Sequence, residues 1–171
     1  LQQLGVTSIL MTPLYASLYY HNYFATDFKK IDPEYGTMKD YIELVKAVHQ
    51  RGMKIYMDME TQYVTGDQLW YKDSYKNPKS PYSHYLIYNG PGNTKPEPII
   101  YNISNLPGYD GTVRKVATVN LKNPQVQEYN YNLFKYWVDP NGDGKFDDGV
   151  DGFRLDHMMD DLDTKPQLQN L

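Results

Sequence analysis

Two aspartates and an arginine stand where strands of a parallel sheet are expected to end. Asp58 closes the run Met-Lys-Ile-Tyr-Met-Asp over residues 53–58, and Asp156 closes Gly-Val-Asp-Gly-Phe-Arg-Leu-Asp over residues 149–156. Arg154 lies two residues before Asp156, so both side chains point to the same face of a strand. An arginine beside a carboxylate keeps it ionised, as a carboxylate nucleophile requires. A buried structural ion pair would give the same pattern, so the pair alone leaves both interpretations open.

Residues 139–148, Asp-Pro-Asn-Gly-Asp-Gly-Lys-Phe-Asp-Asp, follow the pattern of calcium-binding loops, whose oxygen ligands occupy alternate positions. Gly144 supplies the sharp turn. Val150 stands where such loops carry a bidentate glutamate, so Asp148 or Asp151 would complete the shell. The candidate ligands are the side chains of Asp139, Asn141, Asp143, Asp147 and Asp148 and the carbonyl group of Lys145. We expect a structural calcium ion; an acidic turn without metal is the alternative.

The elements that would position these residues alternate between strand and helix. Residues 6–12 form an apolar run, which predicts a buried strand. A polar, aromatic loop follows at residues 19–23. Thr37 and Asp40 have the spacing of a helix N-cap, and Gly52 fits the residue after a last helical turn, so a helix is expected over about 38–51. Strand, helix and strand in this order predict a parallel α/β fold.

The alternation stops after residue 60 and resumes near residue 116. Residues 61–115 are rich in Pro, Gly, Asn and Tyr, and we expect them to form an inserted subdomain, since a structureless loop of this length is improbable. Asn123 and Pro124 predict the start of a helix over about 124–138. We therefore divide the chain into α/β residues 1–60, an insertion at 61–115, and α/β residues 116–171. In a parallel barrel the active site lies at the carboxyl ends of the strands, which brings Asp58, Arg154 and Asp156 together.

Composition excludes several other classes. The chain has 40% hydrophobic residues, a formal net charge of -4 and no cysteine, which argues against nucleic-acid binding and excludes a disulfide framework. No run reaches the roughly 20 apolar residues that a membrane span needs. There are 18 tyrosines against five phenylalanines. Tyrosine suits the apolar faces and polar edges of sugar rings, although a tyrosine-rich core and surface would explain the count equally well.

Several separate motifs identify a resemblance to the α-amylase catalytic barrel. They are Tyr-His-Asn-Tyr at residues 20–23, Asp-Phe at 27–28, Ile-Asp-Pro-Glu-Tyr-Gly-Thr at 31–37, the run from Leu44 to Asp58, and the run over 149–156. The resemblance covers nearly the whole chain. It implies a partial (β/α)8 barrel with a subdomain inserted after the third barrel strand. It also implies an α-glucan substrate and, from the habits of the family, a periplasmic, extracellular or cell-surface location.

The resemblance also implies roles for individual residues. Asp156 is similar to the nucleophile that forms a covalent glycosyl intermediate, and Arg154 to the arginine that orients it. Asp58 resembles an aspartate that supports the sugar subsite beside the cleaved bond. Tyr20 resembles a tyrosine that stacks on that sugar, with His21 following it in the motif. For Tyr20 an exposed loop aromatic is the alternative.

The resemblance places the general acid, a glutamate, on the next barrel strand. We expect that position beyond Leu171, because none of the glutamates in the chain that we considered matches its motif, namely Glu43, Glu60, Glu97 and Glu128. The chain begins without methionine and looks cut at both ends. By itself it is expected to bind substrate poorly and to be inactive.

The chain departs from the family at four positions. After Asp58 the family has an asparagine, which binds calcium, and a histidine; here they are Gln62 and Tyr63. After Asp156 a lysine and a histidine are replaced by Met159 and Asp160. The family calcium site is therefore in question, and substrate preference is expected to differ from ordinary starch hydrolysis.

Three functional classes stay open from the sequence. The first is a retaining enzyme, either an α-glucan hydrolase or a transglycosylase or isomerase of the same family, and α-1,4 and α-1,6 linkages are not separated. The second is a non-catalytic relative such as a barrel ectodomain of a transporter partner, against which the retained Asp156 argues. The third is a calcium-dependent module supported by residues 139–148 alone.

Overall fold

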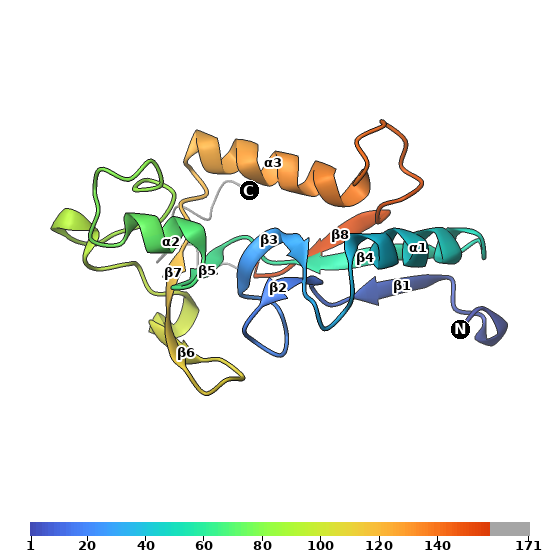
Figure 1. The fold of residues 1–171 in the computed structure, drawn as a ribbon, viewed down its shortest axis with the longest axis horizontal. Helices are drawn as coiled ribbons and strands as arrows, with labels where there is room; N and C mark the ends of the chain where they lie inside the picture. Colours follow the sequence, from blue (N-terminus) through green and yellow to red (C-terminus); the bar gives the residue numbers. More distant parts are fainter. Residues whose placement is uncertain (158–171) are drawn as a thin grey trace.

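A parallel sheet forms the frame of the molecule in the computed structural model, which describes residues 1–157 (Figure 1). Its strands are β1 (Ser8–Met11), β4 (Lys54–Met59) and β8 (Gly152–Leu155), in the order β1-β4-β8. Both pairs are parallel, and Asp58 is directly opposite Arg154 in the β4–β8 register. The predicted strands at 6–12, 53–58 and 150–156 are therefore confirmed, the first and third with narrower bounds and the second shifted by one residue.

Helices α1 (Met38–His49) and α3 (Pro124–Val138) connect and cover these strands. The Thr37 side chain accepts a hydrogen bond from the Asp40 backbone, and Asn123 caps α3, which confirms both predicted starts. The two helices meet at Tyr41, whose hydroxyl donates to the Trp137 carbonyl group at 2.7 Å. Val45, Val126, Leu133 and Trp137 are fully buried and join Ile55 and Met57 of β4 in one core.

A β-hairpin between β1 and α1 was not predicted. Strands β2 (Tyr15–Ser17) and β3 (Ala25–Ile31) pair antiparallel, with register shifts on both sides of Ala16. The irregular pairing removes the two-residue alternation by which a strand is recognised in sequence. The predicted aromatic loop, residues 19–23, lies between the two strands, so the hairpin carries Tyr20, His21 and Tyr23.

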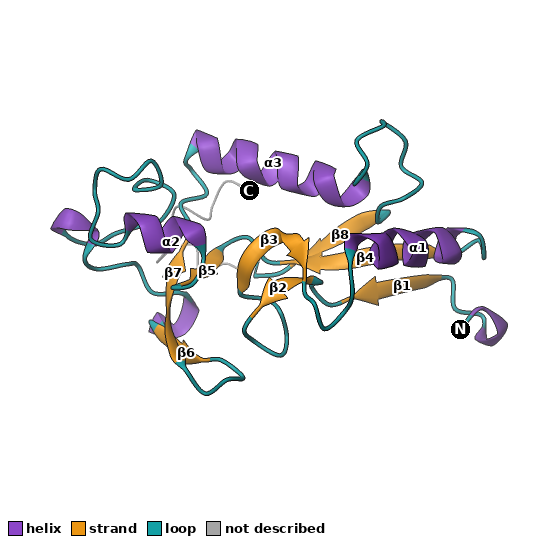
Figure 2. Ribbon diagram, in the orientation of Figure 1, coloured by secondary structure: helices purple, strands orange, loops and turns teal. Residues whose placement is uncertain are grey.

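The segment between β4 and α3 folds around a second sheet (Figure 2). Strands β5 (Tyr63–Thr65), β7 (Val113–Thr118) and β6 (Asn105–Pro107) are antiparallel, in the order β5-β7-β6. The segment also contains helix α2 (Leu69–Ser74) and the 3-10 turns Pro91–Asn93 and Ile100–Asn102. Strand β7 runs through residue 115, where the predicted insertion ends. A further 3-10 turn, Gln2–Leu4, precedes β1.

Strands β1 and β8 are the edges of the parallel sheet. Each edge carries an exposed leucine, with Leu10 58% and Leu155 43% accessible. Exposed, unpaired edges of this kind favour association with further strands. No helix among residues 1–157 has the length and apolar character needed to cross a bilayer.

Candidate active site

Asp58, Arg154 and Asp156 meet at the carboxyl ends of β4 and β8. Arg154 Nη1 lies 3.1 and 3.0 Å from the two carboxylate oxygens of Asp58 and 2.5 Å from Asp156 Oδ1. The Asp58 and Asp156 side chains are only 8% and 14% accessible, whereas Arg154 is 50% accessible. The hydrogen bond with Asp58 raises the pKa of Arg154. The guanidinium group therefore bridges two carboxylates, as their positions at the ends of neighbouring strands predicted.

Tyr23 is part of this group, although no role was predicted for it. Its hydroxyl donates to Asp58 Oδ2 at 2.7 Å. Burial and the bond to Asp58 raise the pKa of Tyr23 to about 12, so the tyrosine is neutral at ordinary pH. The motif at residues 20–23 could have indicated Tyr23, but the family resemblance gave roles only to Tyr20 and His21 of that motif.

Tyr20 and His21 lie in the same loop, but neither has a hydrogen bond or ion pair with Asp58, Arg154 or Asp156 among the described residues. Tyr20 is 84% exposed, and its ring contacts that of His21 at 4.9 Å between centroids. His21 Nδ1 accepts from the Tyr23 backbone at 3.1 Å, and burial lowers the pKa of His21. His21 thus supports the loop that carries Tyr23, while Tyr20 presents a free aromatic face.

Glu60 adds a third carboxyl group that sequence reasoning passed over. It follows β4 directly and is fully buried. Its Oε1 accepts from the Gln62 backbone at 2.5 Å, whereas Oε2 has no hydrogen-bond partner within residues 1–157. Burial raises the pKa of Glu60 well above its ordinary value, and the negative charges of Asp156 and Asp58 raise it further. Full burial keeps Glu60 away from the leaving group of a bound substrate.

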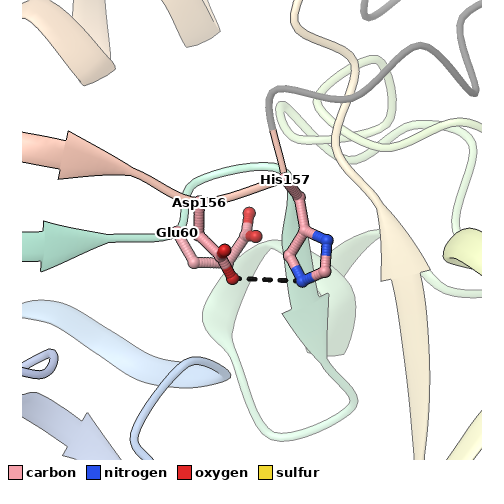
Figure 3. A group of neighbouring side chains, drawn as sticks. All are labelled: Glu60, Asp156 and His157. Atoms are coloured by element: carbon pink, nitrogen blue, oxygen red, sulfur yellow. Dashed lines mark ion pairs between the residues drawn. The ribbon is translucent and has the colours of Figure 1, made fainter.

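His157 lies beside Asp156 and Glu60, in one group of three side chains (Figure 3). Its Nε2 is 3.1 Å from Asp156 Oδ2, and its backbone has a positive φ of 51°. Ligand-type atoms of Glu60, Asp156 and His157 all lie within 4.8 Å of one another. A metal ion bound by these three residues would be coordinated by Asp156, the expected nucleophile, which would then not be free to attack a substrate. We therefore interpret the three side chains as interacting carboxyl and imidazole groups without a metal.

Gln62 occupies the position where the family asparagine was expected. It is 2% exposed, and its Nε2 donates to the backbone carbonyl group of Asp156 at 3.3 Å. The longer side chain is thus used to hold the backbone that carries Asp156. Tyr63, the second departure, begins β5 and is buried. Met159 and Asp160, the two departures after Asp156, lie outside the described residues.

The 139–148 loop has a regular network of internal hydrogen bonds. Asp139 accepts from the backbones of Asp143 at 3.1 Å and Gly144 at 2.9 Å. Asn141 and Asp143 accept from backbone N–H groups two residues later, the second of which belongs to Lys145. Within residues 1–157, no three carboxylates of this loop bring ligand atoms within 4.8 Å of one another.

Asp148 is the buried member of the loop. It is 1% exposed, its Oδ1 has no hydrogen-bond partner in the described part of the chain, and burial raises its pKa. Asp151, the alternative to Asp148 in the predicted shell, is engaged elsewhere, with Lys54 at 2.7 Å and His49 at 2.9 Å. Of the two, Asp148 is the residue left to complete a cation shell, whereas Asp147 is exposed.

Parallel strands joined by helices, with polar groups gathered at the carboxyl ends of the strands, are the arrangement of part of a parallel α/β barrel. The sequence pattern described as "Alpha amylase, catalytic domain" matches residues 1–169, and the chain belongs to this family of glycoside hydrolases. This confirms the family resemblance drawn from the motifs. It also supports the barrel fold, of which the described residues contain three parallel strands.

Individual relatives span several activities. Alpha-amylase 3 of Dictyoglomus thermophilum is 30% identical over 163 residues, which are 94% of this chain and 31% of that protein. An oligo-1,6-glucosidase of Halalkalibacterium halodurans is 33% identical over 91% of this chain and 28% of its own length. A trehalose synthase/amylase of Mycolicibacterium smegmatis is 29% identical over 90% and 27%.

The crystal structure of the α-amylase from H. orenii has a TM-score of 0.71 and 30% identity, covering 96% of this chain and 34% of that one. The chain thus spans about a third of the length of the relatives it matches.

Proposed function

We propose that the chain belongs to the catalytic barrel of a retaining enzyme acting on α-glucans, with Asp156 as its nucleophile. The observation that carries the proposal is the contact of Arg154 Nη1 with both Asp58 and Asp156. The guanidinium group thereby fixes the position of the Asp156 carboxylate beside Asp58. Membership of the α-amylase family supports the choice of substrate class.

The proposed reaction has two steps. The Asp156 carboxylate attacks the anomeric carbon, the glycosidic bond breaks, and a general acid protonates the leaving oxygen. Water or a sugar hydroxyl then attacks the covalent glycosyl-Asp156 and releases the carboxylate, while the same acid group, now a base, accepts the proton. Arg154 and Asp58 orient the nucleophile and the sugar beside it. The general acid is expected on the next barrel strand, since Glu60 is fully buried.

Hydrolysis and sugar transfer differ only in what attacks the intermediate. The named relatives include an oligo-1,6-glucosidase and a trehalose synthase/amylase, so transfer or isomerisation is the second candidate. Analysis of the products formed by the full-length protein from maltooligosaccharides, isomaltose and pullulan separates these outcomes. A non-catalytic role is disfavoured by the intact contact between Arg154 and Asp156.

Activity of the full-length protein tests the nucleophile. Asp156→Asn is expected to lower kcat by several orders of magnitude, because the amide cannot form the glycosyl ester. Asp67→Asn is the matched control, since Asp67 pairs with Arg114 away from this site, and it is expected to retain activity. Full activity in Asp156→Asn would exclude the mechanism.

We also propose that the 139–148 loop binds a structural calcium ion. The buried Asp148, whose Oδ1 has no partner within residues 1–157, supports the proposal. Asp139, Asn141, Asp143 and the Lys145 carbonyl group are the other proposed ligands, with Asp147 on the solvent side. Because the loop precedes β8, an ion there would fasten the strand that carries Arg154 and leads to Asp156.

A further inference from the structure

Glu60 lies against the proposed nucleophile. It is placed by β4, two residues after Asp58, while Asp156 follows the neighbouring strand β8 (Figure 3). Tyr15 fixes the Glu60 backbone, because its hydroxyl accepts the Glu60 N–H at 3.1 Å and donates to the Glu60 carbonyl group at 3.3 Å. The carboxyl group then reaches within 4.8 Å of Asp156.

No cation forms an ion pair with Glu60 among the described residues. The nearby arginine, Arg154, instead contacts Asp58 and Asp156. An ionised Glu60 would be a fully buried carboxylate beside two other carboxylates, which is energetically unfavourable. A protonated Glu60 avoids this cost and turns the unpaired Oε2 into a hydrogen-bond donor.

We infer that Glu60 is held as a neutral carboxylic acid that donates a hydrogen bond to the Asp156 carboxylate and so positions the nucleophile. The inference rests on the proposed function, because Asp156 has its catalytic meaning only there. A hydrogen bond to a carboxylate is stronger than one between neutral groups and favours the charged acceptor. Glu60 is thus a positioning residue, and the general acid is a different group.

Two of the charged groups near Glu60 favour its neutral form, and one favours its charged form. Asp58 and Asp156 disfavour a further negative charge, Arg154 opposes them in part, and burial is the largest influence on the pKa of Glu60. Tyr15 meets the Glu60 backbone and is itself neutral, since burial raises its pKa well above the ordinary value. His157 Nε2 lies 3.1 Å from Asp156 Oδ2, and a ring nitrogen of His157 also lies within 4.8 Å of a Glu60 carboxyl oxygen.

Two variants of the full-length protein separate hydrogen bonding from packing. Glu60→Gln keeps the shape and one donor, and Glu60→Leu keeps similar bulk without a donor. We expect Glu60→Gln to stay within about threefold of wild-type kcat/KM and Glu60→Leu to lose about ten- to hundredfold. In Glu60→Leu the acidic limb of the pH profile should move up by about one unit, because Asp156 lacks the donor that favours its charged form. Equal losses in both variants, with an unchanged acidic limb, would show a packing role and overturn the inference.

Infrared spectroscopy gives a readout that does not depend on activity. In the difference spectrum between the wild type and Glu60→Gln near neutral pH, one carbonyl band of a neutral carboxylic acid is expected, while the band of the general acid, present in both proteins, cancels. In Asp156→Asn the band should disappear at a lower pH than in the wild type, because a neighbouring negative charge is removed. Absence of the wild-type band would overturn the inference even if Asp156 proves to be the nucleophile. Conversely, full activity of Asp156→Asn would refute the proposed function, whereas the infrared band of Glu60 would still be observed.

Metal binding is the competing account of the same cluster. Calorimetric titration with Zn²⁺ compares the wild type with Glu60→Gln and His157→Gln. We expect no Zn²⁺ site in the wild type that is lost in both variants. Such a site would overturn the inference, because a coordinated carboxyl group is deprotonated.

Discussion

Arg154 is paired with Asp58 across the β4–β8 ladder, and one of its nitrogens, Nη1, contacts both oxygens of that carboxylate at 3.1 and 3.0 Å. The same nitrogen lies 2.5 Å from Asp156 Oδ1. Two acidic groups from neighbouring strands are thus held by one cation, so the position of the proposed nucleophile depends on β4 as well as β8.

Replacement of Arg154 should disable the site without unfolding the protein. Arg154→Lys keeps a charge, but the lysine ammonium group ends one bond short of the position of Nη1, which contacts both carboxylates. We expect kcat to fall about ten- to hundredfold, from the loss of about 1.5–3 kcal/mol in a charge-assisted contact. Arg114→Lys is the matched control, because Arg114 pairs with Asp67 and Asp110 and has no hydrogen bond or ion pair with Asp58 or Asp156 among the described residues. Equal effects of the two substitutions would contradict a specific role for Arg154.

The two tyrosines of the aromatic loop should behave differently. Tyr23→Phe removes the hydroxyl that donates to Asp58, and kcat/KM is expected to fall about tenfold. Tyr20→Phe keeps the exposed ring and should change little, whereas Tyr20→Ala should raise KM if the ring stacks on sugar, as the family resemblance predicts. Steady-state kinetics on maltooligosaccharides measures all three variants. If Tyr23→Phe has the kcat/KM of the wild type, the hydrogen bond between Tyr23 and Asp58 does not contribute to catalysis.

Stability should depend on pH through Glu60. A carboxyl group whose pKa is raised in the folded state contributes stability that is fully present below its unfolded pKa, about 4.3, and that is lost as pH rises. The unfolding free energy of Glu60→Gln should therefore exceed that of the wild type by an amount that grows above about pH 4.3. The limiting slope is about 1.4 kcal/mol per pH unit. Urea unfolding of both proteins between pH 4 and 7 measures the difference, and a constant difference would mean that Glu60 ionises normally.

Calcium should stabilise the proposed loop. At a calcium concentration about 100 times the Kd, the protein is expected to gain about 2.7 kcal/mol, which raises Tm by several degrees. Asp148→Asn should remove most of this gain. Asp151→Asn should lower Tm equally with and without calcium, because Asp151 pairs with Lys54 and His49. Scanning calorimetry with calcium or a chelator tests this, and an unchanged Tm would favour an acidic turn without metal.

The sequence contained enough information to bring Asp58, Arg154 and Asp156 together, because parallel strands end at one edge and their side chains alternate with a period of two. It did not identify Tyr23 or Glu60. Glu60 stands two residues after Asp58, so the alternation of side chains places both on the same face of the strand. Its burial, however, depends on contacts such as the one with Tyr15, which lies 45 residues away in the sequence. Contacts between distant segments of this kind carry no local pattern.

The β2–β3 hairpin and strand β7 were not predicted from the sequence, for a related reason. The register shifts beside Ala16 disrupt the alternation of side chains. Strand β7 continues to Thr118 because it pairs there with Tyr63 of β5. Capping, by contrast, is local, so Thr37 and Asn123 correctly marked the starts of α1 and α3.

Trapping the covalent intermediate tests the central claim most directly. A 2-deoxy-2-fluoro or 5-fluoro glycosyl fluoride should inactivate the full-length enzyme by slowing release of the glycosyl ester, and peptide mass spectrometry should find one added glycosyl group on Asp156. The account predicts this label, and predicts none in Asp156→Asn. A label on another carboxylate, such as Asp58, would contradict the assignment of Asp156 as the nucleophile.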